Sequence, residues 1–309
     1  AAVFFLATLL ISNARLIDSP SLREKAYIAA TSAIVASAFV LTLSRGAFIL
    51  APAAVLLLWA RLPRDQVLPS LWYFIAIDIL PTALLVLPVT QASLAGEWQR
   101  VLLWTLGSAL LGVAGLVTLH GLRRVPGRVQ NAVALGFLVA LLVGGVALAP
   151  SVIARLPAVF QRITHITPKD LIDSARVEYL RDAYRLALAR PWGYGGGGWM
   201  RAYPQVQQYN YVARDPHSHY ALTLVEAGIP GLVLLVGALV SATCSAVAPH
   251  RTPPVRQSMA VAAITLAVHA AVDIDLSYYM LWLLMWILLG LAHPELDPIP
   301  IKQERRPIF

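Results

Sequence analysis

The residues best suited to chemistry lie in the only long polar stretch of the chain, Ser151 to Tyr220, which carries nine of the 24 Lys and Arg residues. Within it, Thr167 as an N-cap and Pro168 at the first helical position predict an amphipathic helix over residues 168–190. Its polar face carries Arg176, Arg181, Arg185 and Arg190. A guanidinium stays charged at any relevant pH, and its planar fork binds phosphate oxygens in pairs. The charge pattern alone fits a phosphate-binding helix and a basic face toward water or anionic lipid head groups equally well.

Two imidazoles follow at His217 and His219, in the sequence Asp215-Pro-His-Ser-His-Tyr220. Histidine titrates near neutral pH, so either ring is a candidate general base, and a polar residue at the membrane interface is the alternative. No acid or thiol with metal-ligand spacing lies beside them, so the sequence predicts no metal site and no cofactor. Glu226 follows His217 on the same predicted span, about two and a half helical turns deeper. An ionisable residue there favours a functional or structural polar role.

Charged residues also interrupt apolar runs elsewhere. Arg45 stands in Leu43-Ser-Arg-Gly-Ala47, where two apolar runs meet. Its side chain either extends to the membrane interface or, since small residues flank it, binds a ligand. Asp273 and Asp275 break the last apolar stretch and are candidates to orient a His or an Arg. The nearby His269 is a lone histidine close to a span end, which favours a satisfied structural residue over a catalytic one.

These residues must be positioned by membrane helices. The chain has 309 residues, of which 58% are hydrophobic and 13% charged, and its mean hydropathy is +0.68. A soluble domain has about 25% charged residues. The composition therefore predicts an all-α polytopic membrane protein, a bundle of about nine transmembrane helices of which the first is truncated. The single cysteine, Cys244, excludes a disulfide framework, and the net charge of +8 reports loop charges rather than nucleic-acid binding.

The predicted helices follow from the apolar runs. They cover residues 1–12 as a stub, 26–43, 47–60, 67–90, 101–120, 131–149, 220–248, and two helices within 258–292. Pro81 is expected to kink its helix. The predicted divisions are transmembrane helices over 1–150, a long loop over 151–216, C-terminal transmembrane helices over 217–292 and a tail over 293–309. Because the chain begins inside an apolar run, without a Met or a basic region, we expect further transmembrane segments upstream, which makes it the C-terminal portion of a larger protein.

Lys and Arg are distributed unequally between alternate loops. One side receives 13 of them, and the other receives only Arg45 and Arg100 outside the long loop. Cytoplasmic loops carry the excess of Lys and Arg, and long loops are left out of this comparison. The long loop, Arg45 and the turn with Asp273 and Asp275 are therefore predicted to face outward. That side is the periplasm of a Gram-negative bacterium, and the protein is expected in the inner membrane.

A glycine run occupies Gly193 to Gly198 and satisfies the pattern G-x-G-x-x-G. A dinucleotide site needs a strand before this pattern and a helix after it, and here a predicted helix comes first. We therefore reject a dinucleotide site. The run is expected to let the backbone pass close to a substrate or to the helix bundle.

Four segments together resemble the O-antigen ligase and polymerase superfamily. Leu43–Ala47 is similar to its Ser-Arg-Gly-Ala signature. Arg176–Gly195 is similar to its Arg-bearing helix followed by Pro-x-Gly-x-Gly. His217–Gly231 resembles its His-Asn-x-x-Leu-x-x-x-x-Glu-x-Gly-x-x-Gly segment, although Ser218 replaces the usual Asn and Ala221 the usual Leu. Val268–Asp273 resembles its Val-His-x-x-x-Asp, and the four segments occur in family order.

The resemblance implies an inverting, metal-independent glycosyltransferase of lipopolysaccharide biosynthesis. The donor would be a glycan on undecaprenyl pyrophosphate, and the acceptor a lipid A core sugar or a growing glycan. By motif position, Arg45 and Arg176 bind the donor pyrophosphate and His217 is the catalytic base. The expected supporting residues are His219, Glu226, Asp273, Arg181 and Arg185. The remaining partners are membrane lipids, with no nucleic acid.

Other functions stay open at the level of the sequence. A polymerase and a protein O-oligosaccharyltransferase of the same superfamily share these motifs. A transporter of lipid-linked sugars would use the same basic surface for binding but needs no base. A purely structural membrane fragment predicts that Arg45, Arg176 and His217 do not come together in space.

Overall fold

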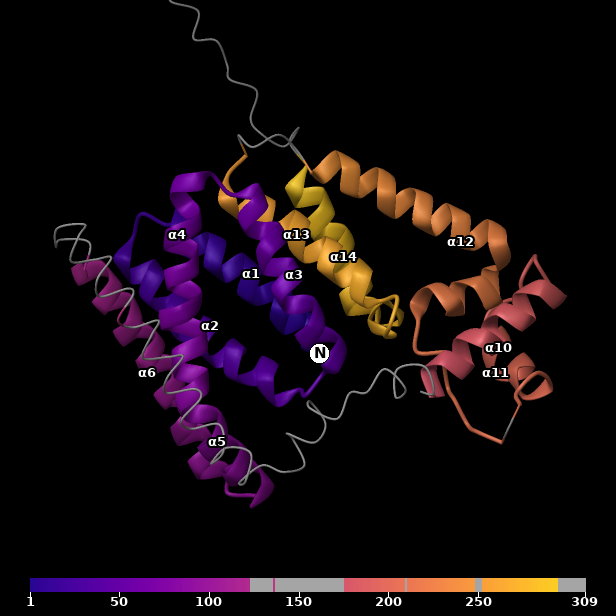
Figure 1. Ribbon diagram of the computed structural model, residues 1–309, viewed down its shortest axis with the longest axis horizontal. Coiled ribbons are helices and arrows are strands. Elements are labelled where there is room, and N and C mark those ends of the chain that lie inside the picture. Colours follow the sequence, from indigo (N-terminus) through magenta and orange to yellow (C-terminus); the bar gives the residue numbers. More distant parts are fainter. Residues whose placement is uncertain (123–135, 137–174, 209, 248–251, 294–309) are drawn as a thin grey trace, which may run out of the picture.

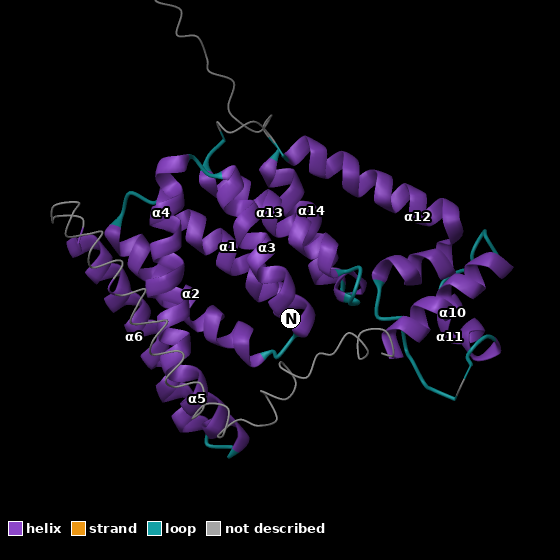
Figure 2. Ribbon diagram, viewed as in Figure 1, coloured by secondary structure: helices purple, strands orange, loops and turns teal. Residues whose placement is uncertain are grey.

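The computed structural model describes residues 1–122, 136, 175–208, 210–247 and 252–293, and the elements formed by these residues are helical, with no strand among them (Figure 2). The N-terminal helices are α1 (Ala2–Asp18), α2 (Leu22–Leu41), α3 (Arg45–Arg61), α4 (Arg64–Tyr73), the π-helix η1 (Phe74–Ile79), α5 (Leu80–Leu94) and α6 (Trp98–Leu122). The later ones are α10 (Ala175–Ala189), α11 (Gly198–Ala202), η2 (Tyr203–Gln205), α12 (His219–Ala246), α13 (Pro254–His269), η3 (Asp275–Ser277) and α14 (Tyr279–Ala292).

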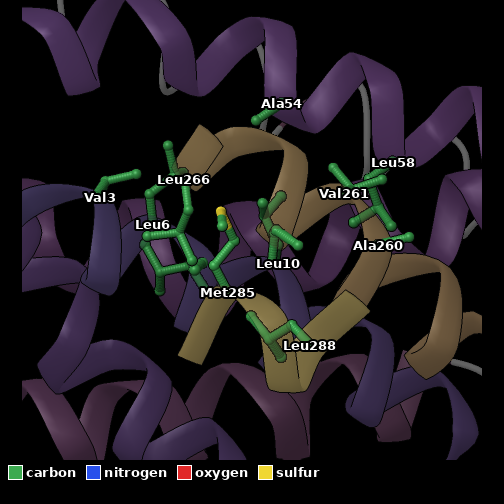
Figure 3. Packing of buried hydrophobic residues seen from close by; sticks show 14 of the residues in the cluster. Val3, Leu6, Leu10, Ala54, Leu58, Ala260, Val261, Leu266, Met285 and Leu288 are labelled. Atoms are coloured by element: carbon green, nitrogen blue, oxygen red, sulfur yellow. The ribbon is translucent and has the colours of Figure 1, made fainter. Parts of the chain in front are cut away.

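The main core lies where the first helices meet the last ones. α1 packs along α13, and α3 and α14 cover the sides of α13 (Figure 1). Aliphatic side chains fill the space between these helices, as Figure 3 shows for Leu10 of α1, Leu58 of α3, Leu266 of α13 and Met285 of α14. On the other side of α1, α2 packs against α5 and α6. This arrangement fixes the N-terminus of α3 beside the connection between α13 and α14.

Within the residues that the structure describes, four helical segments are long and apolar enough to cross a membrane. They are Leu22–Leu41, Arg64–Leu94, Trp98–Leu122 and His219–Ala246. α14 is apolar but shorter, and α3 and α13 form helices at two further predicted positions. The predicted helix over 131–149 lies outside the described residues, apart from Gly136. The fold is therefore that of an all-α membrane protein.

The segment Arg64–Leu94 widens to a π-helix over Phe74–Ile79, immediately before Pro81. Proline has no N–H to donate to the preceding turn, and a π-helix is one way to redistribute the carbonyls that it leaves free. The sequence predicts an irregularity caused by Pro81, and the structure locates it on the N-terminal side of that residue. Asp78 lies within the π-helix, where its Oδ1 accepts a hydrogen bond of 2.7 Å from the Ser32 hydroxyl.

A second, smaller core lies to one side of the bundle, where α10 and α11 meet the first turns of α12 (Figure 1). Trp199 is fully buried at its centre, packed with Ala183 and Leu186 of α10 and Val225 of α12. Residues 168–174 of the predicted amphipathic helix lie outside the described residues, and the rest of that helix corresponds to α10. Its inner face is apolar except for the buried Asp182.

α12 is not the single straight span that the sequence predicts over 220–248. Gly228 has φ +71° and ψ −172°, so the helix breaks there. Pro230 lies two residues further on and has no N–H to donate to the carbonyl of Glu226. The first part of α12 therefore belongs to the smaller core, whereas Leu239 and Ala246, after Gly228, belong to the main core.

Candidate active site

The N-terminus of α3 presents Arg45. Ser44 is the N-cap of this helix, and its hydroxyl oxygen accepts the backbone N–H of Ala47 at 3.4 Å. Leu43, just before the cap, has φ +50°. Arg45 is exposed, and within the described part of the chain no hydrogen bond or ion pair holds its guanidinium group. Its charge is therefore available to a ligand.

The N-terminus of α12 repeats this arrangement around His217. Ser218 is the N-cap and accepts the N–H of Ala221 at 3.3 Å, while His217, just before it, has φ +51°. Leu43 and His217 are the two non-glycine residues with positive φ in the described residues. Such conformations are unfavourable and cluster at functional sites. The cap also explains why Ser218 replaces Asn, since both residue types are preferred N-caps.

The ring of His217 has one covered and one open nitrogen. Its Nδ1 is buried and has no hydrogen-bond partner in the described part of the chain. It lies 3.9 Å from Asp215 Oδ1, and the side chain as a whole is 39% exposed. The Asp215 carboxylate instead accepts the backbone N–H of His217 at 3.0 Å. Tyr179 of α10 stacks on the ring with the centroids 5.8 Å apart. This leaves Nε2 as the nitrogen that an acceptor hydroxyl can approach.

Helix α10 brings Arg176 to the site, and it pairs Arg181 and Arg185 with carboxylates of its own. Arg176 Nη1 donates to the backbone carbonyl of Val272 at 2.9 Å. Arg181 pairs with Glu178 on its own helix, and Arg185 pairs with the buried Asp182 at 2.6 Å. Arg176 therefore faces the connection between α13 and α14, while Arg181 and Arg185 are already engaged with carboxylates.

The connection between α13 and α14, residues 270–278, is the point where the separate segments meet. The carbonyl of Ala270 accepts the backbone N–H of His219 at 2.9 Å, and Ser277 Oγ lies 3.2 Å from His219 Nδ1. Gly46 of α3 lies against the same connection, because a Cβ on it would stand 3.5 Å from Val272 Cγ2. The segments that carry Arg45, Arg176 and His217 are thus assembled around one short stretch of chain.

The two acids of this connection have different roles. Asp275 is buried and its Oδ2 bonds to Nδ1 of the buried His269. Asp273 is half-buried, and its Oδ1 accepts the N–H of Ile274 at 2.8 Å. The other ring nitrogen of His269, Nε2, is buried and has no hydrogen-bond partner among the described residues. The resemblance points to Asp273, but the acid that bonds His269 is Asp275, which the motif does not include.

The glycine run packs against the break in α12. The break at Gly228 frees the carbonyls of Val225 and Glu226. The N–H of Tyr194 donates to Val225 at 2.8 Å, and the N–H of Gly195 donates to Glu226 at 2.9 Å. In return, the N–H of Ile229 donates to Pro191 at 2.8 Å. Of the two predicted roles for the run, a close approach to the bundle is the one observed.

The sequence predicts that Glu226 lies deep in a straight span, and the break in α12 contradicts this prediction. Glu226 lies two residues before the break, half-buried beside the glycine run, and its backbone carbonyl holds that run. The combination of Gly228 and Pro230 inside an apolar helix was the local signal for this break.

One group in the described residues has the side chains to hold a metal ion. Ligand atoms of His269, Asp273 and Asp275 all lie within 4.8 Å of one another. The Nδ1 of His269 is already bonded to Asp275, so a metal would have to replace that bond.

The fold and the site define a membrane protein that gathers arginines and a histidine at the end of its helix bundle. A family model described as O-antigen ligase matches residues 101–236, which include Arg176, the glycine run and His217. This match confirms the resemblance over those residues and supports a glycosyltransferase of the ligase or polymerase type that uses lipid-linked glycans. No curated protein and no solved structure gives a match.

Proposed function

We propose that the protein is an O-antigen ligase-like glycosyltransferase of the bacterial inner membrane. It moves a glycan from undecaprenyl pyrophosphate to a hydroxyl of a lipid A core sugar, with inversion and without a metal. The observation that carries this proposal is the assembly of the Arg45, Arg176 and His217 segments around residues 270–278. A purely structural fragment gives no reason for three charged or titratable segments to meet.

In the proposed reaction each of these residues has one task. The acceptor oxygen attacks the anomeric carbon from the face opposite the pyrophosphate, and the bond from that carbon to the phosphate oxygen breaks. Nε2 of His217 takes the hydroxyl proton. Undecaprenyl pyrophosphate leaves with additional negative charge, which the guanidinium groups of Arg45 and Arg176 stabilise. The hydrogen bond from Arg176 Nη1 to Val272 leaves the other N–H groups of this fork for phosphate oxygens.

The proposed topology has about nine transmembrane helices, with residues 151–216 and the site on the periplasmic face and 293–309 in the cytoplasm. The divisions at 150, 216 and 292 are part of this proposal. The distribution of Lys and Arg between alternate loops supports it. The four segments that are long and apolar enough to cross a membrane support it as well.

A transfer assay tests the proposal. The purified protein in lipid nanodiscs receives an undecaprenyl pyrophosphate-linked glycan and a lipid A core acceptor. We expect glycosylated acceptor, detected by mass spectrometry. Lengthening of the lipid-linked glycan instead would assign a polymerase, and transfer to a hydroxyl of an acceptor peptide would assign a protein glycosylase. Movement of donor across the bilayer of sealed vesicles without any transfer would assign a transporter.

Metal independence makes a separate prediction. We expect chelation with EDTA to leave the transfer rate unchanged, because two guanidinium groups neutralise the leaving pyrophosphate. The matched control is a zinc-dependent hydrolase treated in the same nanodisc buffer. Loss of transfer in EDTA, with recovery on addition of a divalent cation, would contradict the prediction and direct attention to His269, Asp273 and Asp275.

A further inference from the structure

A buried imidazole at the end of α13, His269, bonds to a buried carboxylate of the connection of residues 270–278, Asp275. His269 ends α13 and Asp275 begins η3, so the bond between His269 Nδ1 and Asp275 Oδ2 closes the connection into a loop. The two residues are 2% and 5% exposed, so this bond is shielded from water. A hydrogen bond in such a setting holds the backbone on either side of it more firmly than an exposed one.

One side of this pair faces α3. The Nε2 of His269 is buried against Gly46, where a Cβ would stand only 3.1 Å from it. Gly46 directly follows Arg45, and the absence of a side chain lets the helix N-terminus sit against the ring. The position of the ring therefore sets the position of the first turn of α3. Gly46 also covers Nε2, so the ring cannot reach a substrate there.

Backbone carbonyls between His269 and Asp275 hold the two remaining segments, those that carry His217 and Arg176. Ala270, next to His269, accepts the N–H of His219 at 2.9 Å. Val272, within the loop that the pair closes, accepts Arg176 Nη1 at 2.9 Å. Both carbonyls belong to the stretch whose ends are joined by His269 and Asp275.

We propose that His269 and Asp275 are positioning residues for the transfer reaction, which keep Arg45, Arg176 and His217 at working distances from one another. This inference rests on the proposed function for its effect on turnover. The pair acts through Gly46, Ala270 and Val272, and neither residue touches the donor or the acceptor. Asp275, and not Asp273 of the family-like motif, is the required carboxylate.

Two substitutions of His269 test this assignment. An Asn amide nitrogen can occupy the place of Nδ1, and a Gln amide nitrogen the place of Nε2. We expect His269→Asn to keep the bond to Asp275 and most of the activity. His269→Gln and Asp275→Ala should lower kcat roughly 10- to 100-fold, because small displacements of catalytic groups have such effects, with little change in KM for the donor. Asp275→Asn, which retains an acceptor for Nδ1–H, should rescue the activity.

Hydrogen–deuterium exchange provides a readout that does not depend on the reaction. Asp275→Ala and His269→Gln should speed exchange in peptides covering residues 217–222 and 45–50, whereas Asp275→Asn should not. Gly46→Ala, which presses on the ring, should give the same pattern without removing the pair. Gly290→Ala on α14 is the control, since no atom lies within 4 Å of its added Cβ.

The outcomes separate the two proposals. Unchanged exchange in Asp275→Ala, or unchanged kcat in an active enzyme, overturns the positioning role. Equal loss of activity in His269→Asn and His269→Gln, with native exchange in both, overturns it in favour of a chemical role for the ring. If Asp275→Ala speeds exchange but the wild-type protein transfers no glycan, the pair positions the three segments and the proposed function is rejected.

Discussion

Replacing His217 by Ala is expected to lower kcat for glycan transfer by about 10² to 10⁴, the range typical of a general base. The ring has one nitrogen buried against the protein and one open, and Tyr179 and the Ser218 cap hold its orientation. The KM for the donor should change little, because Arg45 and Arg176 bind the pyrophosphate. Single-turnover kinetics on the nanodisc-embedded enzyme, with donor binding measured separately, checks both statements.

His219→Ala is the matched control for this experiment. The substitution removes an imidazole two residues from His217, whose Nδ1 faces Ser277. It keeps the backbone N–H of residue 219, which bonds to the carbonyl of Ala270. We expect a loss of less than about tenfold, since no proton transfer is assigned to this ring. The reverse order of effects would make His219 the base. Near-normal transfer by His217→Ala, with loss of transfer in Arg176→Ala, would contradict the assignment of His217 as the base and keep that of Arg176 to the donor.

Replacing Gly193 or Gly228 by Ala is expected to cost at least about 2 kcal/mol of stability. Both residues have positive φ, which costs a residue with a side chain roughly 1–2 kcal/mol, and both lack space. A Cβ on Gly193 would overlap the carbonyl oxygen of Glu226, and one on Gly228 would overlap that of Pro191. The three hydrogen bonds between residues 191–195 and the broken helix would be lost together. Thermal unfolding in detergent, followed by tryptophan fluorescence because Trp199 lies in this core, measures the effect.

Gly196→Ala is the control within the same glycine run. This residue does not have positive φ, and no atom lies within 4 Å of its added Cβ. Its substitution should change stability by no more than about 0.5 kcal/mol, as surface changes usually do. Equal unfolding temperatures for the three variants would show that the run does not fasten α10 to α12.

Much of the secondary structure could be predicted because its causes are local. Apolar runs of sufficient length predict helices wherever they occur, and the serines at positions 21, 44 and 218 begin helices because their hydroxyls bond to the next turn. The breaks between α2 and α3 and between α13 and α14 follow from polar residues between apolar runs. The class of protein, an all-α membrane protein, and the candidate residues Arg45, Arg176 and His217 also followed from residue types and motif order.

The arrangement of the candidate site depended on contacts between residues far apart in the sequence. Asp275 rather than Asp273 bonds His269 because the backbone turns back between the end of α13 and η3, where the N–H of Val272 donates to the carbonyl of His269 at 3.0 Å. A linear sequence motif does not specify how the backbone turns between His269 and the two acids.

The sequence by itself determined the helices and the residue types of the site, because hydrogen bonds and hydrophobic burial within one segment are enough to specify them. Only the tertiary structure decided that α12 breaks at Gly228, where the Glu226 carbonyl that Pro230 leaves free accepts a hydrogen bond from the glycine run. It also decided that segments around Arg45, Arg176 and His217 meet at residues 270–278. Such contacts depend on complementary backbone positions in two segments at once, and neither segment alone contains that information.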